Sequence, residues 1–170
     1  GTITNVYGGG KEANVEGSTA VNINTVEKKA HRTNMGAEIP VSDREEKDVL
    51  PAIITNNVFG AGKGLESDVT SALVTGNTKI TMAGGSVAKS VYGGGQLSQV
   101  GGDTYITISG GTIGKDREET ATPGTYTYYG GAEYGNVYGA RLGSELGVGF
   151  GQVKGNTNIT VSGGDILHNI

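Results

Sequence analysis

Histidines and acidic residues are the side chains of this sequence that would first suggest catalysis. The two histidines, His31 and His168, stand far apart in the chain, so they do not form a pair with the spacing of a metal site or a Ser-His-Asp arrangement. Glu16 and Asp103 are predicted to project from equivalent strand faces, but two repeats apart and out of register. Enzymes that cleave polysaccharides need two carboxylates close together. The sequence therefore predicts no catalytic residue.

Two kinds of glycine-rich string approach known binding motifs without completing them. The run Gly60-Ala61-Gly62-Lys63-Gly64 has glycine where a phosphate loop needs Ser or Thr after the lysine. The strings at 101–103 and 163–165 end in aspartate but lack the further glycine of calcium-binding β-roll repeats. The chain has no cysteine, which excludes disulfides and thiolate ligands. We therefore predict no cofactor and no metal site.

A cluster of tyrosines is the strongest candidate for a binding surface. Four of the eight tyrosines fall in one short stretch, namely Tyr126, Tyr128, Tyr129 and Tyr134. Tyrosine offers rigid, amphipathic contact area at low entropic cost, which suits recognition of a glycan or a protein. The alternative is that these rings pack back onto the rest of the fold. The sequence leaves both interpretations open.

A five-residue sequence motif, called the word below, occurs four times. It indicates which elements of the fold must position these residues. It occurs as VYGGG at 6–10 and 91–95, as VFGAG at 58–62 and as VYGAR at 137–141. Apolar and polar residues alternate after each word, which is the period of a β-strand. The first apolar residue of that segment comes nine residues after the valine of the word in copies one and three, and sixteen in copies two and four. Such quantised spacing is typical of stacked repeats.

This pattern predicts an all-β fold, a right-handed parallel β-helix or solenoid with about four coils of 26 to 33 residues. Right-handedness follows from the general bias of parallel crossovers. The chain 1–170 is expected to be a single solenoid fragment, with coils that start near residues 6, 58, 91 and 137. Two loop inserts, at about 24–51 and 114–136, interrupt the first and third coils. Because both interrupt coils late in the repeat, we expect them to emerge near one another.

Equivalent residues of successive coils should lie directly over one another in tracks. The aromatic residue of each word should stack with the next, either as a structural ladder or, if exposed, as a polysaccharide-binding surface. The predicted apolar tracks are Val15, Val74, Val100 and Val153; Val21, Ile80, Ile106 and Ile159; and Ile23, Met82, Ile108 and Val161, beside the aromatic track of Tyr7, Phe59, Tyr92 and Tyr138.

Composition excludes several other classes of protein. The 32 glycines far exceed the average usage of about 7%, which disfavours ordinary helical packing. Charged residues are 18% and the net charge is −4, with no basic cluster, so nucleic acid and anionic membranes are not expected partners. No apolar run approaches the roughly 18 residues that cross a bilayer. Since the sequence begins at Gly1 rather than Met, we expect a processed or excised piece of a longer protein.

VYGGG, followed by V-x-G-x-T-x-I-x-I and then S-G-G-x-I, resembles the large glycine-rich β-helix repeat proteins of bacterial cell surfaces, which have adhesin-like members. The resemblance covers about 115 to 120 residues, all but the inserts. It implies an extracellular or cell-surface scaffold without enzymatic activity, and no functional residue is carried over.

We therefore expect a structural or adhesive repeat module, part of a long rod or a self-stacking filament. Its partners would be further copies or neighbouring repeats end to end, a glycan, or a host or cell-surface protein. The alternative is a carbohydrate-binding or polysaccharide-cleaving β-helix protein.

Overall fold

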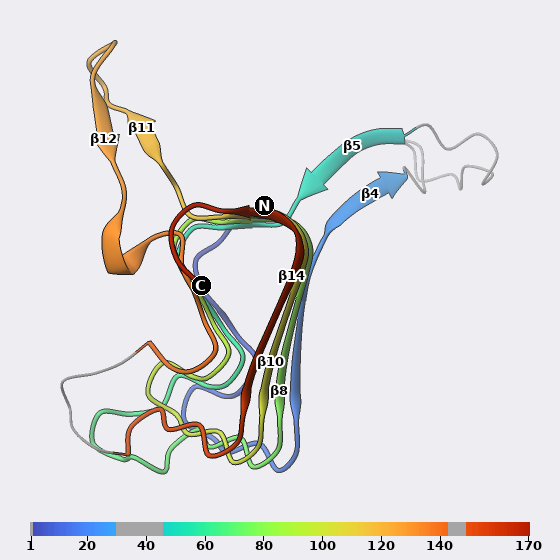
Figure 1. Cartoon of the computed structure of the whole chain (residues 1–170), viewed down its shortest axis with the longest axis vertical. Coiled ribbons are helices and arrows are strands. Elements are labelled where there is room, and N and C mark those ends of the chain that lie inside the picture. The colour runs from blue at the N-terminus through green and yellow to red at the C-terminus, as the bar shows by residue number, and fades with distance from the viewer. Residues whose placement is uncertain (1, 30–45, 143–148) are drawn as a thin grey trace, which may run out of the picture.

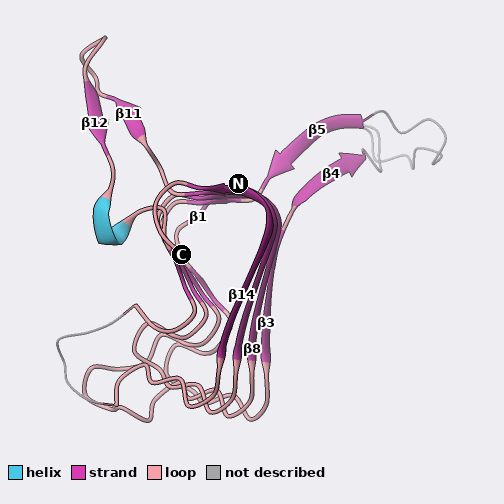
Figure 2. Ribbon diagram, in the orientation of Figure 1, coloured by secondary structure: helices cyan, strands magenta, loops and turns pink. Residues whose placement is uncertain are grey.

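The fold is all-β, with parallel sheets that follow one another around an apolar core. The structure is a computed structural model and describes residues 2–29, 46–142 and 149–170. Within those residues the single helical element is a short 3-10 helix, η2 (Gly131–Glu133), and every other regular element is a strand (Figure 2). None of the described segments is a helix long and apolar enough to cross a membrane.

Two parallel sheets build the body of the molecule. The larger has the order β1-β6-β8-β10-β14, with β3 also pairing with β8; the smaller has the order β13-β9-β7-β2. Strands β8, β10 and β14 are ten residues long and bend around a corner. The strands of the larger sheet are β1 (Thr2–Ile3), β3 (Thr19–Ile23), β6 (Ile53–Ile54), β8 (Thr78–Val87), β10 (Thr104–Ile113) and β14 (Thr157–Ile166); those of the smaller are β2 (Val6–Tyr7), β7 (Val58–Phe59), β9 (Val91–Tyr92) and β13 (Val137–Tyr138).

Each passage of the chain through the two sheets lies over the previous one (Figure 1). We call these passages layers 1 to 4, beginning at Val6, Val58, Val91 and Val137. The valines of the four words pair in register, Val6 with Val58, Val58 with Val91 and Val91 with Val137. The recurrence of the word in the sequence therefore predicted the register of the smaller sheet.

The predicted apolar tracks are also confirmed. Ile80 pairs with Val21 on one side and with Ile106 on the other, and Ile106 pairs with Ile159. Ile80 is fully buried, whereas Val161 of layer 4 is 41% exposed. The core is therefore closed in the middle of the stack and open at layer 4. The two remaining tracks follow the same register, as Ile23, Met82, Ile108 and Val161 and as the bridges Val15, Val74, Val100 and Val153.

Buried threonines tie one layer to the next. Thr19 Oγ1 donates to the Gly60 carbonyl at 2.5 Å, and Thr78 Oγ1 donates to the Gly93 carbonyl at 2.6 Å. Thr104 Oγ1 donates to the Gly139 carbonyl at 2.5 Å. Each hydroxyl thus satisfies the carbonyl of the glycine that follows the aromatic residue in the next word, which a valine of similar shape could not do.

Asparagine or serine before each word forms a second ladder, which the sequence reasoning missed. The backbone N–H of Asn57 donates to Asn5 Oδ1 at 3.2 Å, and the backbone N–H of Ser90 donates to Asn57 Oδ1 at 3.0 Å. The backbone N–H of Asn136 donates to Ser90 Oγ at 3.2 Å, and the backbone N–H of Asn169 donates to Asn136 Oδ1 at 3.3 Å. The signal was present in the sequence, because the residue before every word is Asn or Ser.

The aromatic residues of the words form a stacked ladder. Neighbouring ring centroids are 5.0, 5.1 and 5.1 Å apart, with interplanar angles of 6°, 12° and 16°. Phe59 and Tyr92 in the middle are each 1% exposed. The ladder is therefore a packing element there, as the structural interpretation predicted, and not an exposed surface for polysaccharide.

The inserts leave the body at different corners, so the expectation that they emerge near one another is wrong (Figure 1). The first insert leaves the larger sheet after Ile23, which pairs with Met82, and the chain rejoins that sheet at Ile53, which pairs with Ser86. In layer 1 it therefore takes the place of the bend that β8 makes between Met82 and Ser86. The second follows Ile113, which pairs with Val87, and returns at Val137; it replaces the connection between the two sheets. The first contains β4 (Thr25–Lys29) antiparallel to β5 (Glu46–Pro51); the second contains β11 (Arg117–Glu119) antiparallel to β12 (Tyr126–Tyr128). His31 lies outside the described residues.

Candidate ligand surface on the second insert

The β11–β12 hairpin points away from the layers and carries two of the four predicted tyrosines outward (Figure 1). Tyr126 and Tyr128 are two residues apart in β12, so their side chains lie on one face of the hairpin. Their ring centroids are 6.5 Å apart, and the side chains are 39% and 70% exposed. For this pair, the interpretation that the rings pack back onto the fold does not hold.

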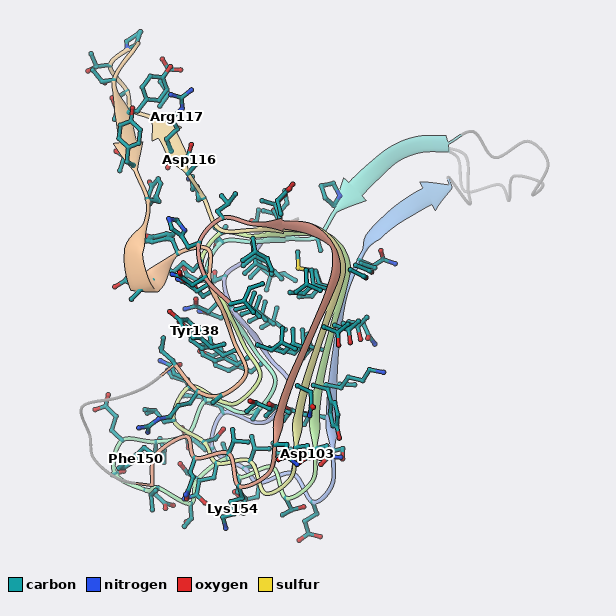
Figure 3. All side chains as sticks on the ribbon, in the orientation of Figure 1. Asp103, Asp116, Arg117, Tyr138, Phe150 and Lys154 are labelled. Carbon is teal, nitrogen blue, oxygen red and sulfur yellow. The ribbon has the colours of Figure 1, made fainter. Side chains whose placement is uncertain are left out.

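Arg117 completes this aromatic surface. It is the cross-strand partner of Tyr128, and its guanidinium carbon lies 4.6 Å from the centroid of the Tyr126 ring (Figure 3). The contact is a cation–π interaction that keeps the planar guanidinium against an aromatic face. The hairpin thus presents two amphipathic rings and a planar set of hydrogen-bond donors. Such a surface can bind the apolar face and hydroxyls of a sugar, or a protein partner.

The other two predicted tyrosines hold the base of the insert instead. Tyr129 and Tyr134 are half-buried, with ring centroids 5.0 Å apart. Lys115 Nζ lies 4.8 Å from the centroid of Tyr129, and Lys89 Nζ lies 5.1 Å from that of Tyr134. The predicted set of four therefore divides into an exposed pair and an anchoring pair.

A charged network supports the anchoring pair. Glu118 Oε2 accepts hydrogen bonds from Lys115 Nζ at 2.7 Å and from the Tyr129 hydroxyl at 2.8 Å. The bond from Lys115, and then that from Tyr129, lowers the pKa of Glu118, so the carboxylate stays charged at neutral pH. Donation to Glu118 in turn raises the pKa of Tyr129.

Asp103 has a structural role that differs from catalysis. Its Oδ1 accepts the Asn156 amide at 2.7 Å and its Oδ2 accepts the Tyr105 hydroxyl at 2.9 Å (Figure 3). The bond from the Asn156 backbone, followed by that from Tyr105, lowers the pKa of Asp103. Glu16 lies in layer 1 and Asp103 in layer 3, so the two do not form a catalytic pair. Among the residues that the structure describes, no three His, Cys, Asp or Glu side chains gather as metal ligands.

The glycine-lysine run at 60–64 is explained by packing between layers. A Cβ on Gly60 would lie 2.2 Å from the Gly93 carbonyl oxygen, so the position requires glycine without any phosphate. The Lys63 amide donates to the Gly10 carbonyl at 3.0 Å.

Comparison of this chain with protein-family models, with curated proteins and with solved structures finds no match.

Proposed function

We propose that this chain is a stretch of a right-handed parallel β-solenoid that serves as a structural or adhesive module on the bacterial cell surface and stacks end to end through its layers. The in-register pairing of equivalent residues through four layers supports the solenoid. Each layer uses the next to bury its apolar track and to receive its threonine hydroxyl. Such a unit gains stability with every layer added.

The repeated contacts between successive layers carry the stacking proposal, and layer 4 shows which groups the next layer would cover. Strand β14 pairs with β10 alone within the described chain, and its Val161 is 41% exposed. Thr157 follows the register of Thr19, Thr78 and Thr104, is exposed, and makes no side-chain hydrogen bond with the residues that the structure describes. Unpaired edges with exposed apolar residues are templates for another strand of the same kind.

Layer 1 offers the complementary surface. Gly8 occupies the position of Gly60 and Gly93, whose carbonyls accept threonine hydroxyls from the preceding layer. A second copy placed with its layer 1 on layer 4 would therefore offer the Gly8 carbonyl to Thr157. Neighbouring layers of a longer chain would use the same contacts.

This stacking has one steric requirement. Ile3 and Ile166 occupy equivalent positions in the larger sheet. Successive pairs connect them, in the order Ile3, Ile54, Val87, Ile113 and Ile166. Residues 2–5 of an incoming copy would thus occupy the place of residues 165–169. Either β1 of that copy or residues 165–169 of the first copy must be displaced before layer 1 can pair with β14.

We expect the average mass in sedimentation velocity to rise with concentration for the natural sequence, and Val161→Lys to suppress this rise. The lysine would place a charge on the apolar edge that the next layer must cover. Tyr128→Lys, which adds the same charge on the hairpin, should associate like the natural chain. A constant monomer mass at all concentrations, or equal suppression by the two variants, would contradict end-to-end stacking.

Carbohydrate binding by the exposed face of β12 is the second candidate function. It is favoured by the position of Tyr126 and Tyr128 beside Arg117. On a glycan array we expect the double change Tyr126→Ala and Tyr128→Ala to weaken binding at least ten-fold, because each ring contributes on the order of 1 kcal/mol of contact. Tyr105→Ala, which removes an exposed tyrosine from the larger sheet, is the matched control. Undiminished binding by the double variant would exclude this face.

A further inference from the structure

The outward face of the β11–β12 hairpin carries two charged side chains beside its two rings. Residues directly opposite each other in an antiparallel pair lie on one face, and so do residues two apart in one strand. Arg117 pairs with Tyr128. Glu119 pairs with Tyr126. All four side chains are exposed, and together we call them the hairpin face.

Arg117 is the charged group of the hairpin face that lacks a counter-ion. Its guanidinium forms no ion pair with a carboxylate anywhere in the described part of the chain. Glu118 belongs to the opposite face, where it supports the anchoring pair. Glu119 turns toward the tip of the hairpin, where its Oε1 accepts the backbone N–H of Gly124 at 2.8 Å. The N–H donors of Arg117 are therefore available to a ligand.

The two rings of the hairpin face have different roles. The Arg117 guanidinium carbon lies 4.6 Å from the centroid of Tyr126, so one side of that ring is already covered. The rings are tilted by 56°, which prevents them from forming a common plane for a flat polysaccharide surface. Tyr128 is 70% exposed and is the ring open for stacking. Tyr126 instead holds the guanidinium before a ligand arrives, which lowers the entropic cost of binding.

We propose that the hairpin face binds a single sugar residue that carries a carboxylate, a hexuronic or sialic acid. The proposal rests on the carbohydrate-binding function given above as the second candidate. The carboxylate accepts two N–H groups of Arg117, the arrangement that a guanidinium matches best. The apolar side of the sugar ring stacks on Tyr128, and a ring hydroxyl donates to the second carboxylate oxygen of Glu119.

Other ligand classes use this face less completely. A neutral sugar can stack on Tyr128, but it gives Arg117 no opposite charge. An acidic peptide supplies a carboxylate without a rigid ring for Tyr128. A small free anion has no ring either, and the carboxylates of Asp116, Glu118 and Glu119 repel it. A sugar with a carboxylate is the class that satisfies both the guanidinium and the open ring.

The test is a titration of the full chain followed by amide NMR spectra at low salt. The probes are the methyl glycosides of glucuronic acid, N-acetylneuraminic acid and glucose; the first and the last share one ring and differ by the carboxylate. We expect saturable shifts at Arg117 and Tyr128. At least one acidic sugar should bind about five-fold or more tightly than the glucoside, and added salt should reduce this preference because the pair is exposed.

Variants separate the role of the charge from that of the rings. Arg117→Gln should abolish the preference for the acidic sugar and leave the affinity for the glucoside nearly unchanged. Lys154→Gln removes an equal exposed charge far from the hairpin and should bind like the natural chain (Figure 3). Tyr128→Ala should weaken the binding of every sugar. Tyr126→Ala should also reduce the preference, because the guanidinium is then no longer held.

A glucoside that binds as tightly as both acidic sugars would overturn this proposal and leave carbohydrate binding by the hairpin intact. An unchanged preference in Arg117→Gln would overturn it as well. Acetate or a glutamate-containing peptide that binds as tightly as the acidic sugars would show that the sugar ring is not recognised. The absence of saturable shifts at the hairpin with every sugar would overturn both this proposal and the carbohydrate-binding function. The tighter of the two acidic sugars identifies the residue that is bound.

Discussion

Replacing Gly93 with alanine is expected to cost more than about 3 kcal/mol of unfolding free energy, the upper end for overpacking a core. A Cβ at this position would lie 2.4 Å from the Gly139 carbonyl oxygen and 3.0 Å from Thr104 Cβ and Oγ1. The carbonyl cannot move aside, because Thr104 already holds it in a hydrogen bond and the carbonyls before and after it, of Tyr138 and Ala140, accept the Gly93 and Gly94 backbone amides. Urea denaturation followed by far-UV circular dichroism measures the loss.

Gly139→Ala is the matched control for this prediction. The three atoms nearest to its Cβ would all belong to the side chain of Thr157, with Thr157 Cβ at 2.7 Å, and none would be a carbonyl oxygen. Thr157 lies on strand β14, which is exposed and pairs with β10 alone within the described chain, so this strand can shift by a few tenths of an ångström and relieve the contact. We expect a clearly smaller loss than for Gly93→Ala. Equal losses would show that close approach between layers is not what requires glycine in the word.

Ile80→Ala is expected to destabilise the protein by about 2 to 5 kcal/mol, the range for removing a large aliphatic side chain from a closed core. Ile80 is fully buried, and its strand lies between those of Val21 and Ile106. The lost contacts cannot be replaced, because neighbouring layers are held at the fixed distance of paired strands. The same denaturation measurement applies.

Ile159→Ala removes the residue of the same track from layer 4 and serves as its control. Ile159 is only partly buried and has a neighbouring layer on one side. We expect a loss of about 1 kcal/mol, since water already reaches part of this side chain and fills the space. A loss as large as that of Ile80→Ala would contradict the view that burial increases from the open edge to the middle of the stack.

The body of the fold was predictable because its order is local and periodic. Alternation marks which side chains face inward. The recurring word sets the register of the strands, so Val58 must pair with Val91 once the strands are parallel. The same argument placed Phe59 in a stacked ladder. For the binding surface, composition alone identified the tyrosine-rich stretch that includes Tyr126.

The sequence by itself thus determined the strands of the two parallel sheets, their register and the tracks of the core, whereas it predicted both inserts as loops and the structure forms a hairpin in each. Only the tertiary structure decided that the inserts leave at different corners (Figure 1), and that Tyr129 packs at the base of the second insert while Tyr128 is exposed. The physical reason is that periodicity specifies contacts between equivalent positions. Contacts between an insert and the layers join positions that are not equivalent, and they depend on the corner from which the insert leaves.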